Sequence, residues 1–241
     1  MRTPSPHTVV DESRVLREEF GPYLGMMDFI VELLGPGTEV VLHDTSDLSR
    51  SIVALTNGHI SGRSVGGPAT DLVLKVLQNL EHDDRDYLAN YRAESSGGHP
   101  FRSSTLFVRD RAGAVVGMLC VNIDDDTMLR ARDLLEMITA TTGVVKGVTE
   151  PPAASRPAPT RVAERLSTTV DELTGEGVAR IVASLGVEPQ RMTSDEKLDA
   201  VRELEAAGVF LLKGAVAQVA PALCVSEPTV YRYLQMVRRA P

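Results

Sequence analysis

The sequence predicts an α+β N-terminal domain, with one antiparallel sheet and flanking helices, followed by an all-α C-terminal domain. Alternating apolar runs predict several short strands before residue 125, and apolar residues at helical spacing flank them. Residues 148–160 (VTEPPAASRPAPT) have the Pro- and Ala-rich composition of an extended linker. Only helical patterns follow this stretch. The chain therefore divides into a sheet domain at 13–147, a linker at 148–168 and a helical domain at 169–241.

The N-terminal domain is predicted element by element from these patterns. Residues 1–12 are polar and Pro-containing, so we expect a disordered leader. An amphipathic helix is expected from Ser13 to Leu34, broken or kinked at Gly21-Pro22. The later elements are strands at 39–44 and 51–56, a helix opening at 68–70, strands at 86–94, 103–109 and 114–123, and a helix from 124 to 138.

Two sequence motifs mark helix starts in the C-terminal domain. Thr169–Glu172 (TVDE) and Thr193–Glu196 (TSDE) are capping boxes, in which the Thr side chain and the Glu side chain each satisfy a free backbone N–H. Gly186 and Gly208 are placed to end the two helices that these boxes open.

Residues 213–239 (KGAVAQVAPALCVSEPTVYRYLQMVRR) carry the strongest functional pattern. Apolar residues at i, i+3, i+4 and i+7 from Val216 line one face of a short helix. Ser226 is placed to cap a second helix by accepting from the Thr229 backbone N–H, with Pro228 in the first turn. Two short helices joined by a tight turn form a helix-turn-helix. Cys224 occupies the turn position usually held by Gly, so we expect a positive φ there.

The solvated face of the second helix is polar and basic. Arg and Gln suit base edges, while Lys and Arg suit phosphates, so we expect double-stranded operator DNA as a partner. The alternative is an ordinary helical hairpin packed on a core. The candidate DNA-contacting residues are Lys213, Ser226, Glu227, Pro228, Thr229, Tyr231, Arg232, Gln235, Arg238 and Arg239.

The net charge of −8 does not exclude DNA binding, because the charge is unevenly distributed. Residues 1–150 carry 14 Lys and Arg against 22 Asp and Glu, whereas residues 209–241 carry four basic residues against Glu227 alone. A basic tip on an acidic body turns that tip toward phosphates.

Composition argues against several other classes. No apolar run approaches a membrane span, and the N-terminus lacks a signal-peptide pattern. Cys120 and Cys224 lie far apart and provide neither a disulfide framework nor zinc spacing, which fits a cytoplasmic protein. The sequence contains no phosphate-binding loop, nucleophile elbow or Cys/His pair. We therefore expect no enzyme activity, no cofactor and no metal.

Two stretches resemble a known family of bacterial regulators. Gly35–Leu72 (GPGTEVVLHDTSDLSRSIVALTNGHISGRSVGGPATDL) resembles the YheO-like PAS domain. Met192–Leu234 resembles the helix-turn-helix of the same regulators, most specifically through Lys213–Val216 (KGAV) and Thr229–Leu234 (TVYRYL). The resemblance covers most of the chain apart from the leader and the linker. It implies a PAS-like sensory domain tethered to a DNA reader, as in a transcriptional repressor.

The resemblance also places residues 35–67 around a PAS ligand pocket. Polar groups at loops and strand ends there can fix a small anion or an amino acid. Two alternatives stay open, namely hydrogen bonding within loops and, for the Gly-flanked Arg63, a flexible surface loop. The candidate ligand-binding residues are His43, Ser51, Asn57, His59, Ser61, Arg63 and Asn122.

We expect a homodimer or a larger even assembly, because one helix-turn-helix contacts too few bases for useful specificity. The helix over 13–34 is the candidate seam, since its apolar stripe is broad. The competing hypothesis is a PAS-type ligand-binding or protein-interaction module whose helix-turn-helix is only structural. The polar residues Arg232, Gln235 and Arg239 argue against it, because a buried hairpin would be apolar at these positions.

Overall fold

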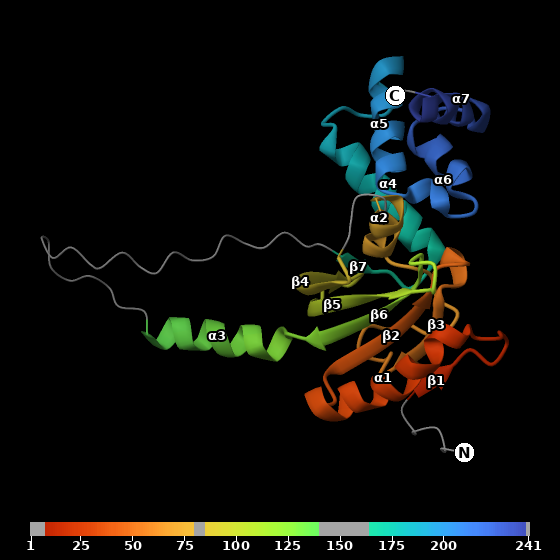
Figure 1. The fold of residues 1–241 in the computed structure, drawn as a ribbon. Helices are drawn as coiled ribbons and strands as arrows, with labels where there is room; N and C mark the ends of the chain where they lie inside the picture. The colour runs from red at the N-terminus through yellow and green to blue at the C-terminus, as the bar shows by residue number, and fades with distance from the viewer. Residues whose placement is uncertain (1–7, 80–84, 140–163, 240–241) are drawn as a thin grey trace, which may run out of the picture.

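The computed structural model describes residues 8–79, 85–139 and 164–239. A curved sheet forms the N-terminal part, and helices form the C-terminal part (Figure 1). Helix α1 (Gly21–Leu34) covers one face of the sheet, whereas α2 (Asp71–Asn79) and the C-terminal helices lie on the other side. The predicted fold class is therefore confirmed.

The sheet has seven described strands in the order β1-β3-β2-β6-β5-β4-β7. All neighbours pair antiparallel except β7, which runs parallel to β4. The strands are β1 (Thr8–Val10), β2 (Thr38–Asp44), β3 (Ile52–Thr56), β4 (Tyr87–Ser95), β5 (Pro100–Arg109), β6 (Val115–Asp124) and β7 (Glu164–Leu166).

The two edge strands, β1 and β7, were not predicted from the sequence. Strand β1 lies within residues predicted as a disordered leader, and β7 lies within the predicted linker, which extended to residue 168. Each is only three residues long, so neither offers enough alternation to be recognised locally. Residues 1–7 of the leader and the Pro-rich stretch lie outside the described residues.

Helix α1 starts later than predicted. A short 3₁₀ turn, η1 (Glu18–Phe20), precedes it, and residues 13–17 are not helical. Gly21-Pro22 therefore begins the helix instead of breaking it, because the first turn does not use the N–H that Pro lacks.

Alternation along β2 divides the core into two layers. Val40 and Leu42 pack with Phe20 and Met27 on the α1 side. Val41 faces the opposite side, in a cluster that includes buried residues of α2 and of the C-terminal helices. One apolar core therefore joins the sheet to the helical part of the chain.

The C-terminal helices follow the predicted start signals. They are α4 (Val170–Ser184), α5 (Ser194–Ala206), α6 (Ala215–Ala222) and α7 (Glu227–Arg239). The Thr169 side chain accepts from the Glu172 N–H, and Thr193 with Glu196 forms a complete capping box. Gly208 follows α5 at a φ of 74°, where a side chain would be strained.

Gly208 also marks the contact between the two parts of the chain. A Cβ built at this position would lie 2.7 Å from the Leu74 carbonyl oxygen of α2, so only Gly permits this approach. Nearby, Arg180 of α4 donates to Asp71 of α2 at 3.0 Å. The helical part is therefore packed on the sheet domain.

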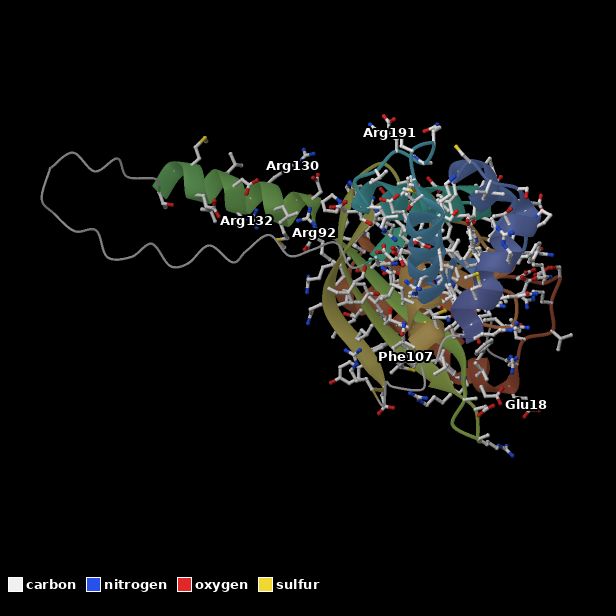
Figure 2. The ribbon with its side chains drawn as sticks, turned by 90° about the horizontal axis from the view of Figure 1, so that it is seen from above. Glu18, Arg92, Phe107, Arg130, Arg132 and Arg191 are labelled. Carbon is white, nitrogen blue, oxygen red and sulfur yellow. The ribbon has the colours of Figure 1, made fainter. Side chains whose placement is uncertain are left out.

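Helix α3 (Asp126–Thr139) extends away from the sheet in Figure 1, and Figure 2 shows the same from above, where Arg130 and Arg132 mark the helix. None of its residues is buried, and Met128 and Ile138 are 71% and 75% exposed. Among the described helices, none is long and apolar enough to span a membrane.

Candidate nucleic-acid interface and buried polar chamber

The turn between α6 and α7 has the geometry that the sequence predicts. Cys224 has a φ of 53°, in the left-handed region. The turn is closed by the Val225 N–H, which donates to the Ala220 carbonyl at 3.0 Å. Because the Cys224 side chain is exposed, the strain is confined to the backbone and no packing depends on the thiol.

Ser226 starts α7 differently from the expected side-chain cap. Its backbone carbonyl accepts the Thr229 N–H at 2.9 Å, while its hydroxyl lies 3.0 Å from the Thr229 hydroxyl. The Ser226 side chain therefore pairs with a side chain and leaves the capping to the backbone.

Helix α7 has one buried apolar face and one open polar face. Val230, Tyr233 and Leu234 are buried against the neighbouring helices. The Arg232 guanidinium stacks 5.6 Å from the centre of the Tyr233 ring. The exposed side chains of α7 and its turn are Ser226, Glu227, Pro228, Tyr231, Arg232, Gln235, Met236, Arg238 and Arg239, while Thr229 is half-buried.

The basic residues around α7 differ in their partners. Arg238 donates to Glu205 of α5 at 2.7 and 3.3 Å, and this hydrogen bond raises the pKa of Arg238. A phosphate would therefore compete with Glu205 for this guanidinium. Lys213 and Arg239 are exposed, and neither has an ion pair recorded within the described residues.

A hollow of about 400 Å³ lies beside the first turns of α7. Glu227, Tyr231 and Gln235 line it from α7, and Gly214 with Ala217 lines it from the start of α6. The open face of α7 thus continues onto the α6 N-terminus, where the positive end of the helix dipole favours an anion.

A second constellation lies inside the sheet domain, on the face that carries α2. The strand register places Glu39 of β2 opposite Asn122 of β6, Asn122 opposite Ser103 of β5, and Ser103 opposite Tyr91 of β4. Glu39, Asn122 and Ser103 are fully buried. This row, with the loop and edge residues that contact it, is called the polar chamber below.

Glu39 is the centre of the chamber. It accepts short hydrogen bonds from the Ser61 hydroxyl and the Arg63 guanidinium, and a bond of 2.8 Å from the Asn122 amide. Burial disfavours the charge on Arg63, but Glu39 compensates, so that the pKa of Arg63 is raised. Arg63 therefore keeps its positive charge although its side chain is only 1% exposed.

Arg63 is incompletely satisfied. Its Nη1 is buried and has no hydrogen-bond partner within the described residues. Most buried donors in proteins are paired, so an unpaired guanidinium N–H provides a site for an acceptor. The loop that carries Arg63 includes Gly62 and Gly66, both at positive φ, which few other residues could adopt there.

Glu164 of β7 closes the other side of the chamber. The Thr70 hydroxyl donates to it at 2.6 Å and the Tyr91 hydroxyl at 2.8 Å. Burial raises the pKa of Glu164, and it also raises the pKa of the neighbouring Cys120 thiol to about 12. Cys120 is therefore a thiol at neutral pH rather than a nucleophilic thiolate.

The chamber includes only part of the predicted ligand set, namely Ser61, Arg63 and Asn122. His43 and Ser51 form a separate buried pair, with 3.1 Å between the His43 Nδ1 and the Ser51 Oγ. Because the Ser51 hydroxyl donates to the Asp44 carbonyl, His43 donates to Ser51. Burial, assisted by the positive charge of Arg63, lowers the pKa of His43 to about 3, so its ring is neutral.

Asn57 and His59 lie elsewhere again. They line a hollow of about 400 Å³ together with Val9, Leu55, Gly58 and residues 63–65, so Arg63 borders both this hollow and the chamber. The Asn57 side chain donates to the Thr38 carbonyl at 3.0 Å. The Asn57 side chain therefore ties its loop to the start of β2.

Sequence reasoning missed Glu39, Ser103, Tyr91, Thr70 and Glu164. Glu39 had a usable signal, because it alternates with Val41 and His43 on the inward face of a strand, where a charge needs a partner. Glu164 had none, because its surroundings come from strands far away in the sequence. No group of three or more metal-ligating side chains occurs in the part of the chain that the structure describes.

Comparison with known proteins identifies both parts of the chain. A model of the YheO-like PAS domain matches residues 15–140, and a model of a helix-turn-helix (HTH) domain matches residues 173–235. Over 216 residues the chain is 28% identical to the transcriptional regulator DauR of Pseudomonas aeruginosa, covering 90% of this chain and 93% of DauR. It is 26% identical to YheO of Escherichia coli, covering 90% of this chain and 83% of YheO.

A protein of Haemophilus influenzae is 24% identical over 217 residues, covering 90% of each chain. Both matched domains are of regulatory types, which favours a non-enzymatic role. The HTH match and the similarity to DauR support a DNA-binding regulator. Since the PAS match spans more than half of its length, the chain belongs to the YheO-like PAS family and carries a C-terminal helix-turn-helix.

Proposed function

We propose that this protein is a sequence-specific transcriptional regulator, acting as a repressor, that places α7 in the major groove of operator DNA. The observation that carries the proposal is the division of α7 into a buried apolar face and an open face with Arg232 and Gln235. A helix of this kind is held rigidly by its core while it presents base-reading groups. The similarity to a transcriptional regulator supports the same function.

The test is binding to the promoter region of the protein's own gene. Arg232→Ala should weaken binding by about 1–3 kcal/mol and relax the preference at one base position, as expected when a bidentate contact to guanine is lost. Lys213→Ala should weaken binding to every sequence. It should also reduce the slope of the logarithm of the binding constant against the logarithm of salt concentration by about one. Arg111→Ala is the control, because Arg111 is exposed in the turn between β5 and β6, far from α7 in the sequence. Wild-type affinity and selectivity in both test variants would rule out α7 as the reader.

We further propose a two-fold assembly with α1 at its seam. The outward stripe of α1 supports this choice, because Met26, Phe29 and Leu33 are 42%, 62% and 67% exposed at helical spacing. The α6–α7 unit of each copy is called its reading head below. Two reading heads about 34 Å apart, or a multiple of this distance, would then contact two half-sites. Light scattering should give a dimer mass at micromolar concentration and a monomer for Phe29→Glu. A monomeric wild-type protein, with and without DNA, would end this proposal.

We also propose that the PAS-like domain binds a small polar molecule in the polar chamber. The unpaired Nη1 of Arg63 supports the proposal, because an acceptor group on a ligand would satisfy it. A thermal-shift screen with amino acids and small carboxylates tests it, with Arg63→Lys as the comparison. A compound that stabilises the wild type and not the variant supports the site, whereas compounds that stabilise both equally bind elsewhere.

A second candidate function is a binding or interaction module whose helix-turn-helix is only structural. The exposed apolar side chains of α3 favour it, since they provide a surface for another protein. The promoter assay decides between the two functions, because a merely structural helix-turn-helix would show no sequence preference.

A further inference from the structure

Strand β7 connects the two parts of the chain in an unexpected way. It immediately precedes α4, yet it pairs with the edge of the sensory sheet, with Glu164 opposite Ala93 and Leu166 opposite Ser95. A segment that the sequence assigned to the linker is therefore a strand of the N-terminal sheet. A parallel strand of three residues forms few backbone hydrogen bonds, so its side chains decide whether it stays docked.

Glu164 anchors this strand inside the polar chamber. Its side chain is 1% exposed, and both carboxylate oxygens are engaged, one by Thr70 and one by Tyr91. The Tyr91 hydroxyl also lies 2.7 Å from the Thr105 hydroxyl of β5. A buried carboxyl group requires hydrogen-bond donors, so a change in Thr70 or Tyr91 alters how firmly β7 is docked on the sheet.

Contacts on the other side of β7 lead to the reading head. Asp71 of α2 accepts from the Arg165 backbone N–H at 2.8 Å and from Arg180 of α4 at 3.0 Å. Farther along, Gln218 of α6 donates to Asp171 of α4 at 2.7 Å. Helices α4 and α6 also share one apolar core, so a shift of α4 moves the helix-turn-helix with it.

We propose that β7 is a latch that couples the polar chamber to the reading head. Glu164 holds the latch closed through Thr70 and Tyr91, and a ligand whose acceptor groups take these two donors from Glu164 opens it. Opening releases α4 from the sheet edge and changes the arrangement of the two reading heads on DNA. This inference rests on the proposed sensing and DNA-reading functions and assigns the residue that links them.

The test uses the full-length chain and needs no effector. Tyr91→Phe removes one donor to Glu164 with little change in volume, and Tyr87→Phe makes the same substitution at an exposed position of the same strand. Hydrogen–deuterium exchange of residues 164–184 reports latch opening. We expect about tenfold faster exchange in Tyr91→Phe, because a buried acceptor on Glu164 loses its hydrogen-bond donor, and wild-type exchange in Tyr87→Phe.

Affinity for the promoter region completes the test. We expect Tyr91→Phe to change it by at least about fivefold and Tyr87→Phe to leave it unchanged, as is typical of coupled sites. Equal exchange in the two variants overturns the latch, and faster exchange with wild-type promoter affinity overturns the coupling. If Tyr91→Phe does not fold, Glu164→Gln provides the same two measurements from the strand itself.

The failure of the latch can be told apart from the failure of DNA reading. Arg232→Ala, measured in parallel, tests the reader without touching the chamber. Weaker promoter binding in Arg232→Ala together with no effect of Tyr91→Phe leaves the reader intact and rejects the latch.

Discussion

Removing the positive charge from the polar chamber should destabilise the fold severely. Arg63→Met keeps a long flexible side chain but deletes the guanidinium that pairs with Glu39. Glu39 would remain fully buried with Ser61 and Asn122 as its hydrogen-bond donors and no cation in contact. A buried carboxylate without its counter-ion has lost the attraction that offset its desolvation.

The magnitude follows from the burial of both partners. Breaking a buried ion pair by removing one partner costs about 3–5 kcal/mol. For a chain of this size about 2–4 °C is lost per kcal/mol, so the melting temperature should fall by roughly 6–20 °C. The double variant Glu39→Gln/Arg63→Met removes the orphaned charge and should recover part of the loss, because an uncharged amide is less costly to bury.

Thermal and urea unfolding followed by circular dichroism measure the effect. Arg132→Met, at an exposed ion pair on α3, is the matched control and should leave the midpoint unchanged. A midpoint for Arg63→Met equal to that of the wild type would refute the reasoning. So would a double variant that is less stable than Arg63→Met by the full cost of a second lost partner.

Three further predictions concern single groups. Cys224→Gly should stabilise the protein by up to about 1 kcal/mol in urea unfolding, because Gly adopts the positive φ without strain; a loss of stability would show that the thiol packs. A thiol reagent at pH 8 should label exposed Cys224 quickly and buried Cys120 only on unfolding, and equal rates would contradict the raised pKa of Cys120. Because burial lowers the pKa of His43 to about 3 from 6.5, the stability that its neutral form provides is complete above pH 6.5 and falls as the pH drops toward 3. His43→Gln should flatten unfolding free energy against pH in that window, whereas the exposed control His59→Gln should not.

Features set by nearby residues could be read from the sequence. The capping boxes at Thr169 and Thr193, the positive φ of Cys224 and the two faces of α7 each depend on residues within one or two turns. Local hydrogen bonding and helical spacing are sufficient to fix them. The cap at Ser226 is the exception, because the Ser226 hydroxyl pairs with the Thr229 hydroxyl and not with the Thr229 backbone N–H.

The polar chamber could be predicted only in part. Ser61, Arg63 and Asn122 were named as candidates, but their common partner Glu39 was not. Glu164 lies 94 positions from Thr70 in the chain, and no local pattern indicates that the two meet. The separation of His43 from this group follows from the strand register, since His43 pairs with Met118 at one end of the sheet while Glu39 pairs with Asn122 toward the other.

The close approach of Gly208 to Leu74 has a consequence for how the protein tolerates a break in its chain. This contact, the Arg180–Asp71 ion pair and the pairing of β7 with β4 hold the helical part on the sheet, and all three involve residues outside 148–160. Two separately expressed fragments, divided within those residues, should therefore associate and regain promoter binding when mixed. Gly208→Ala should prevent this complementation, because a methyl group there would collide with the Leu74 carbonyl.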